Sequence, residues 1–185
     1  LWRFYRFCVE EQVENIEQMA FDQIRKYREQ AMEAGVPQEA GILDRCRKVL
    51  FLQAKDIHWD ADVWYLERFS LQPERIDPSS PVVSLSFVDV THDRNRQLLK
   101  KYMKYGLGLT DLSLRYLQAE MIDIRNFLKE IPQDACDMTE TDFRRYFQRL
   151  QEKRLAAETF NRKVMALQHF YGFLKARDYV GQIPF

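Results

Sequence analysis

Apolar residues recur every three or four positions along most of the chain, which is the period of amphipathic α-helices. The clearest case is Ala156–Leu174, where one stripe holds Phe160, Val164, Leu167, Tyr171 and Leu174. The same spacing predicts a long helix over Glu10–Glu33, which Gly35 and Pro37 would end. It also predicts a shorter helix over about Ile42–Ala54. Helices therefore dominate the expected fold.

Three further helices are expected in the second half of the chain. The first covers Asp93–Tyr105, and Gly106 and Gly108 would break the chain after it. The second has an apolar stripe over Leu114–Leu128. The third begins at Thr139–Asp142, which has the hydroxyl-to-acid spacing of a capping box. Its inward residues would be Phe143, Tyr146, Phe147 and Leu150.

The middle of the chain has a different pattern. Residues Val82–Val90 alternate as in a β-strand, although the sequence does not reveal a partner strand. Upstream, His58, Asp60 and Asp62 could be imagined as metal ligands, but no further His or Cys stands at ligand spacing. Packing of the two nearby tryptophans in a small core is the preferred interpretation. Residues 179–185 are expected to form an extended exit.

These elements predict a mainly α protein with two modules. Residues 1–106 would be a mostly helical N-terminal module with one or two short strands, and residues 107–185 an orthogonal helical bundle. The charge supports a division, since residues 1–92 hold 11 Lys and Arg against 16 Asp and Glu, a net −5. Residues 93–185 hold 17 against 12, a net +5. The basic half is the better candidate for an anionic partner.

Composition narrows the class further. The chain is 46% hydrophobic with only six Gly and six Pro, so a packed core is expected and disorder is not. No apolar run approaches the roughly 18–20 residues that span a bilayer, so no membrane association is expected. Cys8, Cys46 and Cys136 are widely spaced and odd in number, which is typical of reduced thiols in a cytoplasmic protein. The chain begins with Leu, which suggests a piece of a longer protein.

The strongest chemical signal is a basic segment. Between Arg144 and Lys163 seven cations face only two acids, Glu152 and Glu158. The cations are Arg144, Arg145, Arg149, Lys153, Arg154, Arg162 and Lys163. Arg suits phosphate and guanine, and Asn or Gln suits adenine. A helix N-terminus also attracts phosphate, and Thr159 lies in the first turn of the predicted 156–174 helix. The alternative is a solvated helix face of a protein-interaction module.

Motifs for catalysis are missing from the sequence. It has no glycine-rich phosphate loop, no G-x-S-x-G and no H-E-x-x-H. The three histidines are far apart in sequence, and Cys136 has no evident base beside it. We expect no metal, no cofactor and no catalytic residue within these 185 positions.

Three segments resemble the core-binding, SAM-like N-terminal domain of tyrosine recombinases, the phage integrase family. They are Leu117–Leu128, Met138–Phe147 and Ala157–Leu174. The third is the most specific, with matches at Thr159, Asn161, Arg162, Leu167, Phe170 and Leu174. Residues 62–105 look like the longer N-terminal region of transposon-encoded members. The family's closing Asn-Pro is Ile183–Pro184 here, a departure at the last turn.

The resemblance implies a DNA-gripping part of a strand-breaking enzyme that integrates or recombines a mobile element. In such recombinases this domain and a C-terminal catalytic domain clamp duplex DNA, with other protomers assembled on the same site. Residues 1–106 would reach flanking arm DNA or neighbouring protomers, and their net acidity favours the protomer contact. The catalytic tyrosine, arginines and histidines of the family are not found here and are expected beyond Phe185. A bacterial, nucleoid-associated location is implied. The expected DNA contacts are Arg144, Arg145, Arg149, Lys153, Thr159, Asn161, Arg162, Lys163 and His169.

Overall fold

The structure, a computed structural model, describes all residues from 1 to 185. It confirms a mainly α protein with seven α-helices and one two-stranded antiparallel sheet. The helices are α1 (Trp2–Glu10), α2 (Phe21–Glu33), α3 (Ile42–Gln53), α4 (Asp93–Leu109), α5 (Leu114–Glu130), α6 (Glu140–Glu152) and α7 (Ala157–Ala176). The strands are β1 (Val63–Tyr65) and β2 (Ser84–Ser86).

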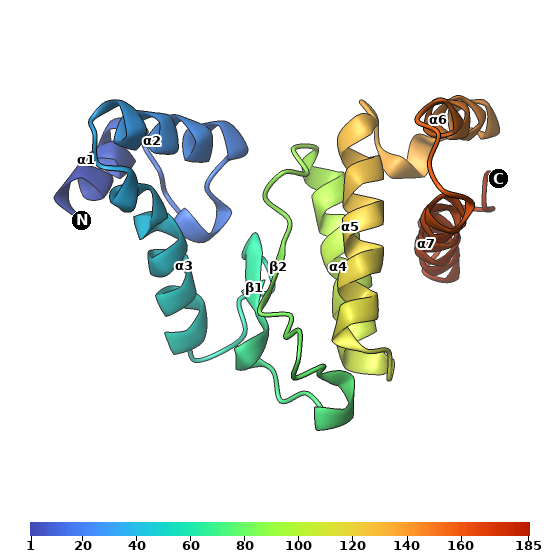
Figure 1. Cartoon of the computed structure of the whole chain (residues 1–185), viewed down its shortest axis with the longest axis horizontal. Helices are drawn as coiled ribbons and strands as arrows, with labels where there is room; N and C mark the ends of the chain where they lie inside the picture. Colours follow the sequence, from blue (N-terminus) through green and yellow to red (C-terminus); the bar gives the residue numbers. More distant parts are fainter.

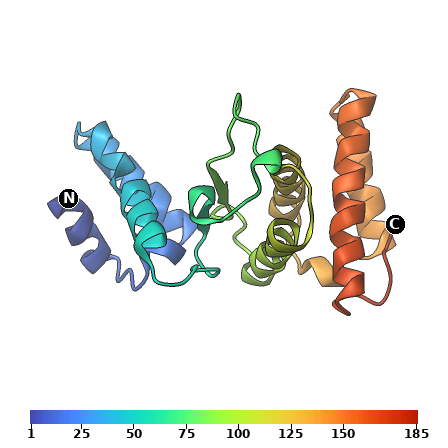
Figure 2. The ribbon, with the colours of Figure 1, turned by 90° about the horizontal axis from the view of Figure 1, so that it is seen from below.

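The elements follow one another across an elongated molecule in nearly sequence order. Helices α1–α3 form one end, the strands and α4–α5 the middle, and α6–α7 the other end (Figures 1 and 2). Two hydrophobic cores hold this arrangement together. A small one of seven buried residues spans Phe4–Leu43, and a large one of 29 spans Phe51–Leu174. The large core crosses residue 106, so the expected division there does not coincide with the division of the cores.

The long helix expected over Glu10–Glu33 is wrong, because the chain breaks between α1 and α2. Gln12 adopts a positive φ of 51°, and Asn15 caps a short 3₁₀ turn at residues 16–18. The guanidinium of the buried Arg47 on α3 holds this break by donating to the carbonyl of Ile16 at 2.6 Å. The end of α2 is as expected, since Gly35 has a φ of 69° where the helix stops.

The strand expected within Val82–Val90 is present, but only three residues of it pair. Its partner is β1, with Trp64 opposite Leu85. Both of these side chains are buried in the large core. Just before β1, the carboxylate of Asp62 accepts a hydrogen bond from Nζ of Lys100 at 2.7 Å, and both groups are buried. This ion pair links the two-stranded sheet to α4.

Helix α4 runs through the two glycines that were expected to end it at Tyr105. Gly106 is a close-approach position, because a Cβ atom there would lie 2.8 Å from Cδ2 of Leu117 on α5. Gly108 faces open space. Helix α4 therefore packs closely against α5.

The helices expected after residue 110 are confirmed. Every member of the α5 stripe is buried, and α7 buries Leu167, Tyr171 and Leu174 as its spacing predicts. At the start of α6, the Thr139 hydroxyl and amide both donate to Asp142, and the amide of Asp142 donates back to Thr139 Oγ1. This reciprocal cap fixes where α6 begins and which residues face outward.

Candidate nucleic-acid interface

The polar face of α6 carries basic residues one helical turn apart. Arg145, Arg149 and Lys153 are spaced by four, while Phe143 and Leu150 face the core. Arg149 is exposed and has no ion-pair partner. Lys153 contacts Glu130 on α5 at 3.0 Å, and Arg145 lies 3.9 Å from Asp142. Both are more than half exposed, so these contacts are weak surface pairs.

The turn between α6 and α7 adds another free cation. Arg154 has a φ of 50°, a left-handed conformation that ends α6. Its side chain is exposed and has no ion-pair partner. Arg154 is not among the contacts expected from the family resemblance. A single non-glycine residue at positive φ leaves no periodic signal, so sequence reasoning could not show where this side chain projects.

Helix α7 begins without a side-chain cap, because its N-cap residue is Ala156. The first backbone N–H groups of the helix are therefore not occupied by a capping side chain. Thr159 is half-buried and Asn161 is exposed in the first two turns. This end of α7 keeps the polar character that the sequence predicts.

Two of the expected phosphate ligands are paired within the protein. Nε of Arg162 lies 2.9 Å and Nζ of Lys163 2.7 Å from the carboxylate of Asp123 on α5. The Asp123 side chain is 1% exposed, whereas that of Arg162 is 58% and that of Lys163 is 16% exposed. Lys163 thus serves mainly to dock α7 on α5, while more than half of the Arg162 side chain remains exposed to solvent.

His169 is also engaged with α5. Its Nδ1 contacts the buried carboxylate of Glu120, whose other oxygen accepts a hydrogen bond from the Tyr102 hydroxyl at 2.9 Å. Burial and the neighbouring carboxylate raise the pKa of Tyr102, so this hydroxyl remains a donor. The network links α4, α5 and α7, and it leaves about half of the His169 side chain exposed.

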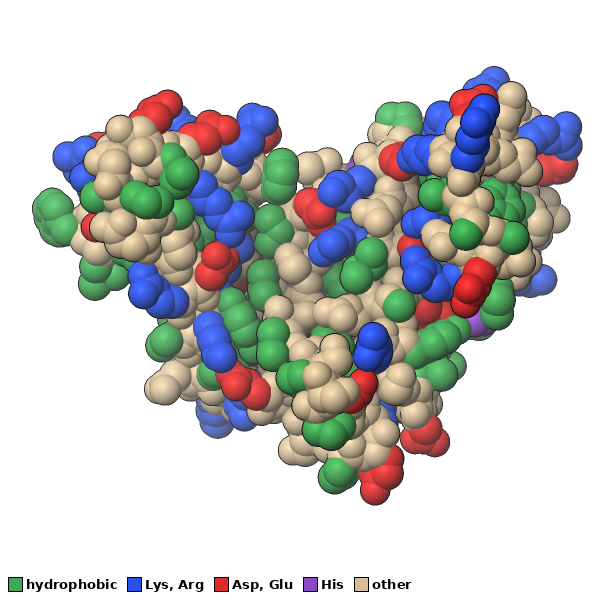
Figure 3. Space-filling model, in the orientation of Figure 1, with side chains coloured by type: hydrophobic (Ala, Val, Ile, Leu, Met, Phe, Trp, Pro, Cys, Tyr) green, Lys and Arg blue, Asp and Glu red, His purple; other side chains and the backbone are tan.

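The structure thus groups the expected residues by position. Those on α6 and in the α6–α7 turn project into solvent, whereas the three on α7 with charged or imidazole groups line its contact with α5. Figure 3 shows Lys and Arg side chains distributed over α5, α6 and α7 at this end of the molecule, with a few acidic groups between them. Among the seven cations of the basic segment, Arg149 on α6 and Arg154 in the following turn are the exposed ones without an ion pair.

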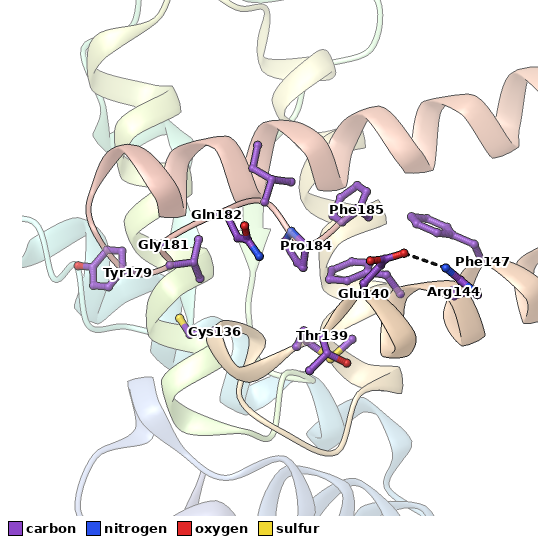
Figure 4. A pocket seen from close by; sticks show the side chains of 14 residues that line it. Cys136, Thr139, Glu140, Arg144, Phe147, Tyr179, Gly181, Gln182, Pro184 and Phe185 are labelled. Atoms are coloured by element: carbon purple, nitrogen blue, oxygen red, sulfur yellow. Dashed lines mark hydrogen bonds and ion pairs between the residues drawn. The ribbon is translucent and has the colours of Figure 1, made fainter.

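An open hollow of about 920 Å³ lies on another side of α6. The C-terminal segment folds back there, and the Phe185 ring lies 4.2 Å from that of Phe143 (Figure 4). Arg144 faces this hollow and pairs with Glu140 at 2.8 Å. Burial raises the pKa of the half-buried Cys136 thiol to about 11. This thiol is therefore a poor nucleophile near neutral pH.

His58 and Asp62, which were considered as metal ligands, each pair with another side chain. Nδ1 of His58 lies 2.7 Å from the carboxylate of Glu17, while Asp62 pairs with Lys100 and Arg96. The two tryptophans pack edge to face, with ring centroids of Trp59 and Trp64 4.9 Å apart. This segment therefore forms part of the large core.

Part of the chain is similar to a known protein family. None of the helices is both long and apolar enough to cross a bilayer. No solved structure matches the chain. Residues 98–180, which run from within α4 to the end of α7, match the family model of the phage integrase N-terminal SAM-like domain. This part of the chain, 83 of its 185 residues, is therefore similar to a phage integrase SAM-like domain, the core-binding domain of tyrosine recombinases.

Proposed function

We propose that this chain is the DNA-binding part of a site-specific tyrosine recombinase and that its C-terminal bundle clamps duplex DNA at the recombination site. Helix α6 and the start of α7 face the major groove. Strand cleavage belongs to a catalytic domain of the parent protein, and none of residues 1–185 is assigned a catalytic role. The N-terminal helices are free to contact neighbouring protomers.

One observation carries the proposal: the exposed cations of α6 and the following turn lack strong counter-ions. Arg149 and Arg154 have no ion-pair partner, and the contact of Arg145 with Asp142 is long at 3.9 Å. DNA backbone phosphates attract such groups, because their binding releases condensed counter-ions from the duplex. Phosphate is thus the expected target of all three.

The remaining candidates take secondary roles in this proposal. Arg162, whose side chain is more than half exposed, contacts DNA while Asp123 fixes the direction of its guanidinium. Lys163 positions α7 rather than binding phosphate, since it is largely buried against the same carboxylate. Thr159 and Asn161 lie near the free N–H groups of α7 and suit polar contacts to phosphate or base edges. Arg144 and Lys153 flank the interface.

A salt titration of duplex binding tests the proposal. Each lost phosphate contact reduces the slope of log K against log salt by about 0.9, so an Arg149→Ala/Arg154→Ala variant should bind more weakly with a slope smaller by about 2. The matched control is Arg6→Ala/Arg25→Ala, which removes the same charge from exposed positions on α1 and α2. It should leave the slope nearly unchanged.

Equal slopes for the wild-type protein and the α6 variant would overturn the assignment of this surface. A flat, weak isotherm on every duplex would instead support the protein-interaction alternative. Tighter binding to one candidate element end than to a generic duplex would support a site-specific role.

A further inference from the structure

A second basic surface lies at the opposite end of α7 from the proposed duplex interface. It surrounds a pocket of about 380 Å³ between α4, the end of α7 and the loop before β1. Arg162 and Arg177 are 15 residues apart on α7, which corresponds to about 22 Å along the helix axis. The pocket is therefore a separate site from the surface of α6.

Three cations and no carboxylate line the pocket. Lys101 and Lys104 come from α4 and Arg177 from the C-terminal end of α7. None of the three forms an ion pair within the chain, and all are exposed. In most of this protein Lys and Arg lie beside Asp or Glu, so this group stands out. Its unbalanced charge is complementary to an anion.

Four aromatic rings, together with Gly108 and Leu109, form the rest of the wall. Nζ of Lys104 lies 4.3 Å from the centroid of the Trp59 ring, and Nζ of Lys101 lies 2.9 Å from the Tyr179 hydroxyl. The rings of Tyr105 and Phe173 pack at 5.4 Å, and Tyr105 is 37% exposed. A ligand that fits has both negative charge and a flat aromatic face.

We propose that this pocket binds the base and phosphate of an unpaired nucleotide within a DNA strand. Aromatic walls with adjacent cations are the means by which proteins hold single-stranded nucleic acid. Base faces are available for stacking only where the strands are unpaired, which excludes an intact duplex as the ligand. A strand also offers one phosphate per nucleotide, so the cations on the two sides of the pocket bind neighbouring phosphates. This proposal does not depend on the duplex interface of α6.

Gly108 gives a way to block the pocket without disturbing the core. It lines the pocket on the same face of α4 as Lys101 and Lys104, and a Cβ atom there would have no neighbour within 4 Å. Gly108→Leu fills the pocket and replaces a poor helix former. Gly108→Ala is the matched control, because it removes the glycine but leaves the pocket open.

The experiment measures binding of a fluorescein-labelled dT12 strand to the full chain by anisotropy. Gly108→Leu should weaken this binding about tenfold or more, as expected for the loss of stacking, whereas Gly108→Ala should stay near wild type. Arg177→Ala should weaken it as well. Lys175→Ala should not, because Lys175 is exposed on the same helix end but does not line the pocket.

Two further arms separate the possible outcomes. Duplex affinity should be insensitive to Gly108→Leu and sensitive to Arg149→Ala/Arg154→Ala, so failure of one site can be distinguished from failure of the other. Quenching of tryptophan fluorescence by dTMP tests the free nucleotide as a source. It is measured in a Trp2→Phe background, where Trp59 is partly exposed and the other remaining tryptophan, Trp64, is fully buried. Binding of dTMP as tight as dT12 would overturn the assignment to a strand. Unchanged dT12 binding by Gly108→Leu would overturn the pocket itself.

Discussion

At the scale of single residues, carboxylates of α5 decide how many cations remain available to a ligand. Asp123 lies between Arg162 and Lys163, and Glu120 contacts His169. Both carboxylates are buried. Removal of Asp123 would leave Arg162 and Lys163 without their counter-ion, and removal of Glu120 would leave the Tyr102 hydroxyl without its acceptor. These residues therefore contribute to the docking of α7 before they contribute to any interface.

The cap of α6 makes a residue-scale prediction about pH. Hydrogen bonds from Thr139 hold the pKa of Asp142 below its ordinary value of 3.8. A depressed folded-state pKa stabilises the protein above the unfolded-state value, and this contribution is lost as the pH falls through the folded-state value. Asp142→Ala should therefore lower the urea midpoint at pH 7, and the difference from wild type should narrow below about pH 3.8.

Glu152→Ala provides the control for this measurement, since Glu152 is an exposed acid on the same helix with no ion-pair partner. Its difference from wild type should not narrow at low pH. A constant gap for Asp142→Ala across the same pH range would contradict the role assigned to the carboxylate.

Sequence reasoning identified the cations but could not identify their counter-ions. The sequence predicts Arg162 and His169 as DNA contacts, and that role stays a prediction. Their partners Asp123 and Glu120 lie 39 and 49 residues away, and only the antiparallel packing of α5 on α7 brings them together. Arg149 needed no such information, because a residue on the polar side of an isolated stripe is exposed wherever the helix packs.

At the scale of elements, the two glycines of α4 differ in how closely neighbouring atoms approach them. Gly106 allows α4 to approach Leu117, whereas Gly108 has open space beside it. Gly106→Leu should lower the free energy of unfolding by about 1–3 kcal/mol, because overpacking a core contact forces side chains and backbone apart. Gly108→Leu should leave stability unchanged or raise it by up to about 1 kcal/mol. Urea denaturation of the two variants gives the comparison.

Equal effects of the two leucines would mean that the glycines differ only in helix propensity and that the contact with Leu117 is unimportant. The expectation that these glycines end the helix failed for a related reason. Glycine destabilises a helix by about 1 kcal/mol, which is less than the stabilisation from burying apolar residues such as Met103 and Leu107 on the same helix.

The break between α1 and α2 shows the same limit of local patterns. The spacing of apolar residues alone favours one continuous helix through Ile16, but long-range hydrogen bonds stabilise a turn there instead. The amide of Asp62 donates to the carbonyl of Glu17 at 2.8 Å, and Arg47 donates to the carbonyl of Ile16. Helices α5 and α7 were predictable because their stripes are long and face one core.

At the scale of the whole molecule, the two cores differ greatly in size. The core around Tyr27 contains seven buried residues, whereas the core around Phe127 contains 29. Because a smaller core offers less burial to oppose local opening, backbone amides of α1 and α2 should exchange with deuterium sooner than those of α5 and α7. Hydrogen-exchange mass spectrometry of the intact chain tests this order.

Equal protection at the two ends would indicate that the chain opens only as a single cooperative unit. The control peptide is the centre of α3, which reports on both cores at once. It should exchange no faster than α1.

Helix α3 connects the two hydrophobic cores rigidly. Leu43 near its start is buried in the small core and Phe51 near its end in the large one, only about 12 Å apart along a continuous helix. Because α3 is a continuous helix, it fixes the spacing and the relative orientation of the two ends of the molecule. A flexible linker would leave both free to vary. The entropy cost of aligning the two ends of the molecule is therefore included in the free energy of folding and is not incurred again on binding. A macromolecule long enough to touch both ends would thus engage the second with little additional ordering cost.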